Sequence, residues 1–246
     1  MPPDRPAKPP ARPGLSAWLA LHGLTAAMLE RHLAPPPDLP PGPPPDPPLP
    51  VAATPDDILA RLMRAAPALA PALDQVQTRA RFDLAPDRAR FPRAFTLHDD
   101  GSGRPFVSCP CDGRAGDLLR LAHEIGHACQ ILANPGADLP PVLRETAAYL
   151  AEGLLVAGAL AEGDPLAPAL AARARADSHA IAARDGARLR AALADAAADP
   201  PYSYRWNYPL ARRLAQAALD GWPPADMAAL VTAPPPLATL LARLPP

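Results

Sequence analysis

Apolar residues recur every three or four positions along most of the chain, a spacing that predicts helices rather than strands. Residues 14–33 follow this spacing and are expected to form one helix. Its apolar side consists of five residues, Leu15, Trp18, Leu19, Leu24 and Met28. A second helical stretch should begin at Thr54, which can cap it, and should run to about residue 81 with interruptions at Pro67 and Pro71.

The pattern changes between residues 94 and 109. Two short runs that contain aromatic and β-branched residues flank Asp-Asp-Gly-Ser-Gly at 99–103, which is typical of a turn, so a β-hairpin is predicted. Beyond the hairpin the helical spacing returns, and clusters of Gly, Pro and Asn separate the segments. The helices expected there span residues 115–132, 140–161, 166–198, 203–220, 224–232 and 236–244. The sequence therefore predicts a mainly α fold with one small β-hairpin.

Proline is concentrated at the front of the chain, where 17 of the 39 prolines lie within the first 50 residues. Residues 1–13 are also polar and basic, and they are expected to be disordered. Residues 34–50 hold 11 prolines, which predicts a semi-rigid polyproline spacer. A binding segment for a proline-recognising partner is the alternative use of residues 34–50. The chain is therefore divided into a proline-rich segment, 1–50, and a folded domain, 51–246.

Charge and cysteine content argue against several classes of protein. The formal net charge of −1 lacks the basic excess that is typical of nucleic-acid-binding proteins. No uncharged apolar run is long enough to span a membrane, and the first residues do not resemble a secretory signal. An odd number of cysteines suits a reducing compartment, and all three are expected to be buried apolar thiols: Cys109, Cys111 and Cys129. The expectation is a cytoplasmic protein that binds neither nucleic acid nor membrane.

The strongest chemical signal is a His-Glu-x-x-His motif inside the helix expected at 115–132. Four residues make about one helical turn, so His123 and His127 project from one face and can reach the same metal ion. Glu124 falls beside the metal, where it can take a proton from a water molecule. Two surface histidines on an amphipathic helix are the ordinary alternative. Apolar residues surround the motif and favour a buried helix, in which polar groups need partners.

The next expected helix offers a third metal ligand. Glu145 lies 18 residues after His127, and Glu152 follows two turns later on the same helical face. A hydrolytic zinc site needs three protein ligands and an open position, which makes Glu145 the expected third ligand. Glu152 can accept a hydrogen bond from a ligand histidine without touching the metal. The alternative is that both glutamates are ordinary solvated helix residues.

Three blocks of the sequence together resemble the catalytic half of the M3 family of zinc oligopeptidases, the group of thimet oligopeptidase and oligoendopeptidase F. The first block runs from Phe82 through the expected hairpin to the His-Glu-x-x-His motif. The second is Glu145 with Glu152, and the third is Tyr-Ser-Tyr-Arg-Trp at 202–206. The resemblance covers residues 80–245.

This resemblance implies a zincin-like fold of the gluzincin type, and a metalloendopeptidase that hydrolyses peptides with one zinc ion. It implies that the zinc ligands are His123, His127 and Glu145. Glu124 then acts as the general base, and Tyr204 donates a hydrogen bond to the developing oxyanion. From the residues alone, packing of a helix start against the core is the commoner role for a tyrosine such as Tyr204.

Two other functions fit the same motif. Two histidines and a carboxylate can also hold iron, which would suit a peptide-tailoring enzyme that oxidises its substrate. The other is an inactive metal-binding module recruited through the proline-rich segment. For a peptidase, the substrate is expected to lie extended along the edge of the strand at 105–109. Arg144 and Arg205 could meet a substrate carboxylate, although arginines on helices usually face water.

Overall fold

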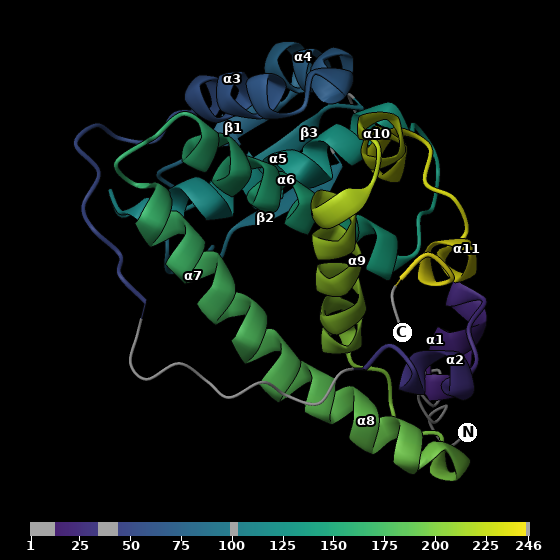
Figure 1. The fold of residues 1–246 in the computed structure, drawn as a ribbon. Helices are drawn as coiled ribbons and strands as arrows, with labels where there is room; N and C mark the ends of the chain where they lie inside the picture. Colours follow the sequence, from purple (N-terminus) through teal and green to yellow (C-terminus); the bar gives the residue numbers. More distant parts are fainter. Residues whose placement is uncertain (1–12, 34–43, 99–102, 245–246) are drawn as a thin grey trace, which may run out of the picture.

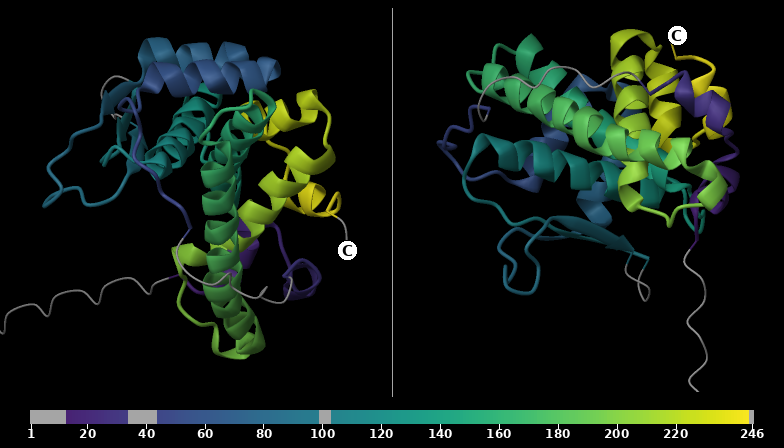
Figure 2. Two further views of the ribbon diagram at one scale, coloured as in Figure 1. Left: turned by 60° about the vertical axis from the view of Figure 1, so that its left-hand side comes forward. Right: turned by 90° about the horizontal axis from the view of Figure 1, so that it is seen from below.

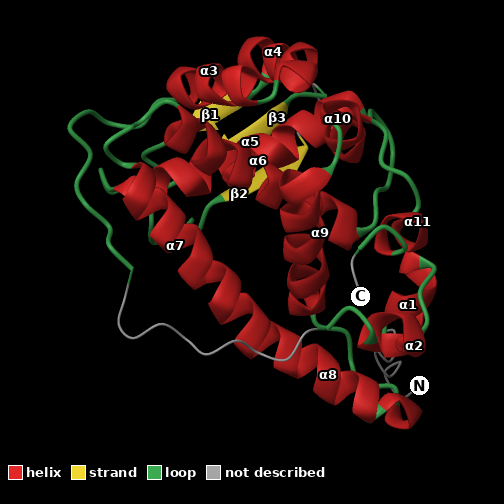
Figure 3. Ribbon diagram, in the orientation of Figure 1, coloured by secondary structure: helices red, strands yellow, loops and turns green. Residues whose placement is uncertain are grey.

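The structure is a computed structural model that describes residues 13–33, 44–98 and 103–244. Helices dominate it, and a small sheet lies against them (Figures 1 and 3). The helices are α1 (Leu15–His22), α2 (Ala26–Glu30), α3 (Pro55–Ala65), α4 (Ala70–Arg79), α5 (Ala115–Ala133), α6 (Pro141–Ala161), α7 (Ala167–Ala180), α8 (Ala187–Ala194), α9 (Asn207–Gly221), α10 (Pro224–Thr232) and α11 (Leu237–Leu241). Short 3₁₀ turns occur at Pro67–Leu69, Ala196–Ala198 and Tyr204–Trp206. The strands are β1 (Arg81–Asp83), β2 (Phe95–His98) and β3 (Pro105–Ser108).

Helices α5 and α6 pack against each other at the centre, and α9 packs on α6 (Figure 1). Helices α3 and α4 cover one end of this pair, while β2 and β3 contact α5. Helix α7 leads through a π-helical stretch, Ile181–Gly186, into α8, and together they form the long helical arm seen in Figure 2. Fully buried leucine and isoleucine side chains from these elements join in one core, among them Leu121, Ile125, Leu150 and Leu210. The His-Glu-x-x-His motif is therefore anchored in this core, next to Leu121 and Ile125.

The sheet confirms the predicted hairpin and adds one strand to it. Strands β2 and β3 pair antiparallel, with Phe95 opposite Ser108 and His98 opposite Pro105. Strand β1 pairs parallel with β3, which gives the order β1-β3-β2. The expectation of a hairpin alone was incomplete, because β1 begins where a helix was expected to end. The tip of the hairpin, 99–102, lies outside the described residues.

Two of the expected helices are interrupted. Gly23 adopts a left-handed conformation with φ of 64°, and it divides the helix expected over 14–33 into α1 and α2. The helix expected over 166–198 changes to π-helical hydrogen bonding at Ile181–Gly186 and ends at Ala194. Among the described residues, no helix combines the length and apolarity needed to cross a membrane.

Part of the expected proline spacer is packed. Residues 1–12 and 34–43 lie outside the described residues, so the predictions there concern segments that the structure does not describe. Residues 47–49 pair with the segment that enters α5. Leu49 N donates to Gly113 O at 2.8 Å, and Ala115 N donates to Pro47 O at 2.9 Å. The prediction that this stretch is not packed was wrong, because its backbone forms hydrogen bonds with residues 113 and 115.

Helix α1 packs into the same hydrophobic core as the later helices, through Leu15 and Trp18. Trp18 Nε1 donates a hydrogen bond of 2.8 Å to Asn207 Oδ1 at the start of α9. His22 Nε2 accepts from Val142 N at 3.3 Å, at the start of α6. These buried contacts attach α1 to the starts of α6 and α9.

Gly126 lets α5 and α6 approach closely. A Cβ atom placed on Gly126 would lie 2.8 Å from both the carbonyl oxygen of Ala147 and the Cα of Ala148. Both of these are backbone atoms, so they cannot move aside without displacing α6. This glycine lies one residue before His127, and the close approach brings the histidines of α5 opposite Glu145 of α6.

We expect Gly126→Ala to lower the free energy of unfolding by about 1–3 kcal/mol, because the added methyl group overpacks the contact. Denaturant unfolding measures the loss. Gly221→Ala is the matched control, since no heavy atom lies within 4 Å of a Cβ placed there. Equal stabilities of the two variants would contradict this account of the helix contact.

Candidate metal centre

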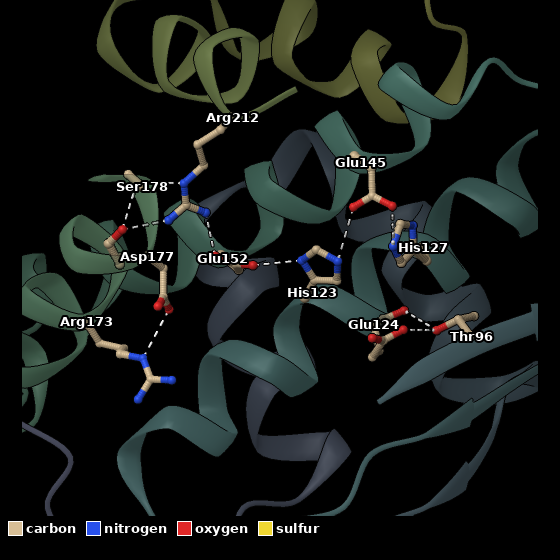
Figure 4. Close-up of polar contacts among 11 residues, drawn as sticks. Thr96, His123, Glu124, His127, Glu145, Glu152, Arg173, Asp177, Ser178 and Arg212 are labelled. Atoms are coloured by element: carbon tan, nitrogen blue, oxygen red, sulfur yellow. Dashed lines mark hydrogen bonds and ion pairs between the residues drawn. The ribbon is translucent and has the colours of Figure 1, made fainter. Parts of the chain in front are cut away.

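His123 and His127 of α5 converge with Glu145 of α6 on one point between the two helices (Figure 4). One ligand atom from each residue lies within 4.8 Å of the other two. His123 Nε2 is 3.5 Å from Glu145 Oε2, and His127 Nε2 is 3.9 Å from Glu145 Oε1. The structure thus brings together the three residues that the sequence predicted as metal ligands.

The geometry of this group fits a metal ion. Tetrahedral ligands at the usual zinc bond lengths lie about 3.4 Å from one another, close to the two distances from the histidines to Glu145, 3.5 and 3.9 Å. Glu145 Oε2 is buried and has no hydrogen-bond partner among the described residues. A buried carboxylate oxygen without a hydrogen bond is costly, and either a protonated His123, 3.5 Å away, or a metal ion at this point lowers that cost. The donor set of two imidazoles and a carboxylate suits zinc or iron.

The two histidines have different electrostatic environments. Burial acts to lower the pKa of His123, but the nearby carboxylates of Glu145 and Glu152 outweigh it and raise the pKa to about 10. Burial and the nearby charge of His123 lower the pKa of His127 to about 4, so this ring is neutral at pH 7. Metal ligation needs an unprotonated imidazole nitrogen, so a metal ion and a proton compete for Nε2 of His123.

Glu152 of α6 orients His123 from the side opposite the metal position. Glu152 Oε1 lies 2.7 Å from His123 Nδ1, which leaves Nε2 of the ring to face the metal. Glu152 Oε2 accepts a hydrogen bond of 2.5 Å from Arg212 of α9, and Arg212 also donates to Ser178 Oγ at 2.7 Å. The sequence predicted the contact between Glu152 and a ligand histidine. It did not predict Arg212 or Ser178, whose positions Figure 4 shows.

We expect Glu152→Gln to weaken zinc binding by about 10- to 100-fold, because an amide group cannot accept strongly from both His123 and Arg212. Competition with a chromophoric zinc chelator measures the affinity. Glu162→Gln makes the same chemical change at an exposed ion pair with Arg64 and should leave zinc affinity unaltered. Equal zinc affinity in both variants would show that Glu152 does not support the site.

Glu124 lies beside the ligand group and is not part of it. The Thr96 hydroxyl, on β2, lies 2.7 Å from Glu124 Oε2 and 3.1 Å from the Glu124 carbonyl oxygen. The side chain is buried, and burial raises the pKa of the Glu124 carboxyl above its usual range. A carboxylate with a raised pKa is a stronger base, and the hydrogen bond to Thr96 fixes its orientation.

Tyr204 lies at the mouth of the site. Its hydroxyl donates a hydrogen bond of 2.7 Å to Glu145 Oε1, while the residue is 40% exposed. Burial of the hydroxyl and the charge of Glu145 raise the pKa of Tyr204, so the phenol keeps its proton at neutral pH. The structure therefore places a hydrogen-bond donor next to the metal ligands. The predicted role of Tyr204 toward an oxyanion stays a prediction.

A cleft of about 510 Å³ lies over these residues, and β2 forms part of its wall. In the sheet order β1-β3-β2, the central strand β3 is paired on both sides. The expectation that a peptide lies along the strand at 105–109 was therefore wrong, because that strand has no free edge. The outer edge of β2 has no strand partner among the described residues, and β2 borders the cleft.

The cysteines do not belong to the metal group that the described residues form. Cys109 and Cys129 are buried, as expected, whereas Cys111 is partly exposed. The Cys111 thiol donates to the carbonyl oxygen of Cys109 at 3.4 Å. A metal centre at the His-Glu-x-x-His motif therefore has nitrogen and oxygen ligands only.

Comparisons with protein-family models, with curated proteins and with solved structures found no match to this chain. The functional interpretation consequently depends on the chemistry of the metal centre and its cleft.

Proposed function

We propose that the protein is a zinc-dependent metallopeptidase that hydrolyses peptide bonds in peptides or oligopeptides. The observation that carries the proposal is the ligand group His123, His127 and Glu145 with a further carboxylate, Glu124, held beside it. Three protein ligands leave one position of a tetrahedral metal open, as in hydrolytic zinc sites. A buried carboxylate next to the ligand residues favours hydrolysis over the oxidative iron chemistry that the same ligands also permit.

Each residue of the site has a part in this proposal. Zinc, when bound, supplies a Lewis acid that polarises the peptide carbonyl and makes water more acidic. Glu124 takes a proton from the attacking water and passes it to the leaving amine. Thr96 holds one oxygen of Glu124, so the other oxygen is available for the proton. Tyr204 donates a hydrogen bond to the carbonyl oxygen as negative charge develops there.

The edge of β2 gives the proposed enzyme a way to hold its substrate. An extended peptide can pair with the backbone N–H and C=O groups of an exposed strand edge, with little dependence on its sequence. This edge, the ligand set and the two glutamates of α6 support the resemblance to the M3 family of zinc oligopeptidases. We therefore propose a zincin-like fold of the gluzincin type.

A peptide cleavage assay tests the proposed function. The zinc-loaded protein is incubated with a library of internally quenched peptides, with and without a chelator. We expect cleavage that the chelator abolishes and that added zinc restores. Oxygen incorporation into a peptide by the iron-loaded protein would support the oxidative alternative. Absence of any peptide change would support a metal-binding module and contradict the proposal.

A further inference from the structure

The two arginines next to site residues have different surroundings. Arg205 Nη1 lies 3.3 Å from Oδ1 of Asp185, a fully buried residue of the π-helical stretch, so Arg205 has an ion-pair partner, which it shares with Arg184 and Arg188. Arg144 is exposed, and its side chain makes no hydrogen bond or ion pair with any other residue that the structure describes. It lies in the first turn of α6, directly before Glu145, and lines the cleft of the metal centre.

We propose that Arg144 binds a carboxylate of the peptide substrate, so that the enzyme prefers peptides with an acidic group near the cleaved bond. This inference rests on the proposed peptidase function and adds the class of substrate to it. The carboxylate can belong to an Asp or Glu side chain or to the C-terminus of the peptide.

The position of Arg144 supports this inference. Arg144 lines the same cleft as His127 and Tyr204, so its guanidinium is available to a group bound beside the metal centre. A guanidinium presents two parallel N–H donors that match the two oxygens of a carboxylate. A peptide bound in the cleft would bring its carboxylate to the Arg144 guanidinium, which has no ion-pair partner among the described residues.

Three further titratable side chains line the same cleft, Asp138, His98 and Tyr208. Asp138 is exposed and does not form an ion pair with Arg144. Its negative charge opposes binding of an acidic peptide, so the two residues should have opposite effects on substrate preference. This opposition supplies a second variant for the test.

Matched peptide pairs test the inference. Each pair has the same cleaved sequence and differs by Asp against Asn, Glu against Gln, or a free C-terminus against an amide. We expect wild-type kcat/KM to be about tenfold higher for the acidic member of at least one pair. Arg144→Gln should reduce this ratio to about one, and Asp138→Asn should increase it. Which pair responds identifies the source of the carboxylate.

Arg175→Gln is the control for the loss of one exposed arginine, since Arg175 lies on α7 outside the cleft of the metal centre. It should keep the wild-type ratio. The inference is overturned if wild type shows no preference in any pair, or if Arg144→Gln keeps the wild-type preference. Cleavage of neutral peptides without such a preference would leave the proposed function standing and remove only the inference about Arg144.

Binding gives a readout that does not need cleavage. Fluorescence anisotropy of labelled peptides should show about tenfold tighter binding of the acidic member by wild type, and none of this difference in Arg144→Gln. The difference should shrink as ionic strength rises, because salt screens exposed charges. Equal binding of acidic and neutral peptides by wild type would overturn the inference even if no peptide were cleaved.

Discussion

Replacing Glu124 by glutamine should reduce peptide cleavage by a factor of about 10³ while zinc stays bound. Glutamine has nearly the same volume as glutamate and can keep a hydrogen bond to Thr96, so the surroundings of the metal should not change. The amide cannot take a proton from the attacking water at neutral pH. The measurement is kcat on a quenched peptide, together with the zinc content of the same sample.

Glu162→Gln is the control for this experiment, because it removes an exposed carboxylate at the C-terminal end of α6. It should keep both kcat and zinc content. Cleavage by Glu124→Gln at the wild-type rate would refute the assignment of Glu124 as the base. A loss of zinc along with cleavage would instead place Glu124 among the ligands, contrary to the geometry described above.

The second large effect concerns a ligand. Replacing His127 by alanine should weaken zinc binding by more than the roughly 10- to 100-fold expected for groups that only support a ligand. The loss follows because His127 is the ligand that is neutral at pH 7, and no other described residue can replace it at this face of α5. Chelator competition measures zinc affinity, and circular dichroism verifies that the fold is retained.

His98→Ala provides the matched control, since His98 lines the same cleft and is outside the ligand group. This variant should bind zinc with wild-type affinity. If His127→Ala and His98→Ala bound zinc equally well, the metal would have to lie elsewhere in the protein.

The local parts of this site were predictable from the sequence. His123, Glu124 and His127 follow from the His-Glu-x-x-His motif and its helical spacing, and the apolar residues around them predicted a buried helix. The turn residues at 99–103 predicted the hairpin because turn chemistry is local. Strand β1 was not predictable in this way, because its partner in β3 lies 25 residues further along the chain, with Arg81 opposite Phe106.

The residues that support the ligands were harder to find for the same reason. Arg212 lies 60 residues from Glu152 in the sequence. No local sequence pattern predicts that α9 packs on α6. One signal was nevertheless present. Tyr204, Tyr208 and Arg212 recur at intervals of four residues, which places them on one face of a helix. Extending the tyrosine pair by one further turn would have made Arg212 a candidate for the site.

The central claim is that one zinc ion is bound by two imidazoles and a carboxylate. X-ray absorption at the zinc edge of the purified, zinc-loaded protein tests it most directly. We expect only nitrogen and oxygen neighbours at about 2.0–2.2 Å, with the outer-shell scattering of two imidazole rings. Sulfur neighbours at about 2.3 Å would contradict the claim, because they would place the metal at the cysteines near β3 instead of at His123, His127 and Glu145.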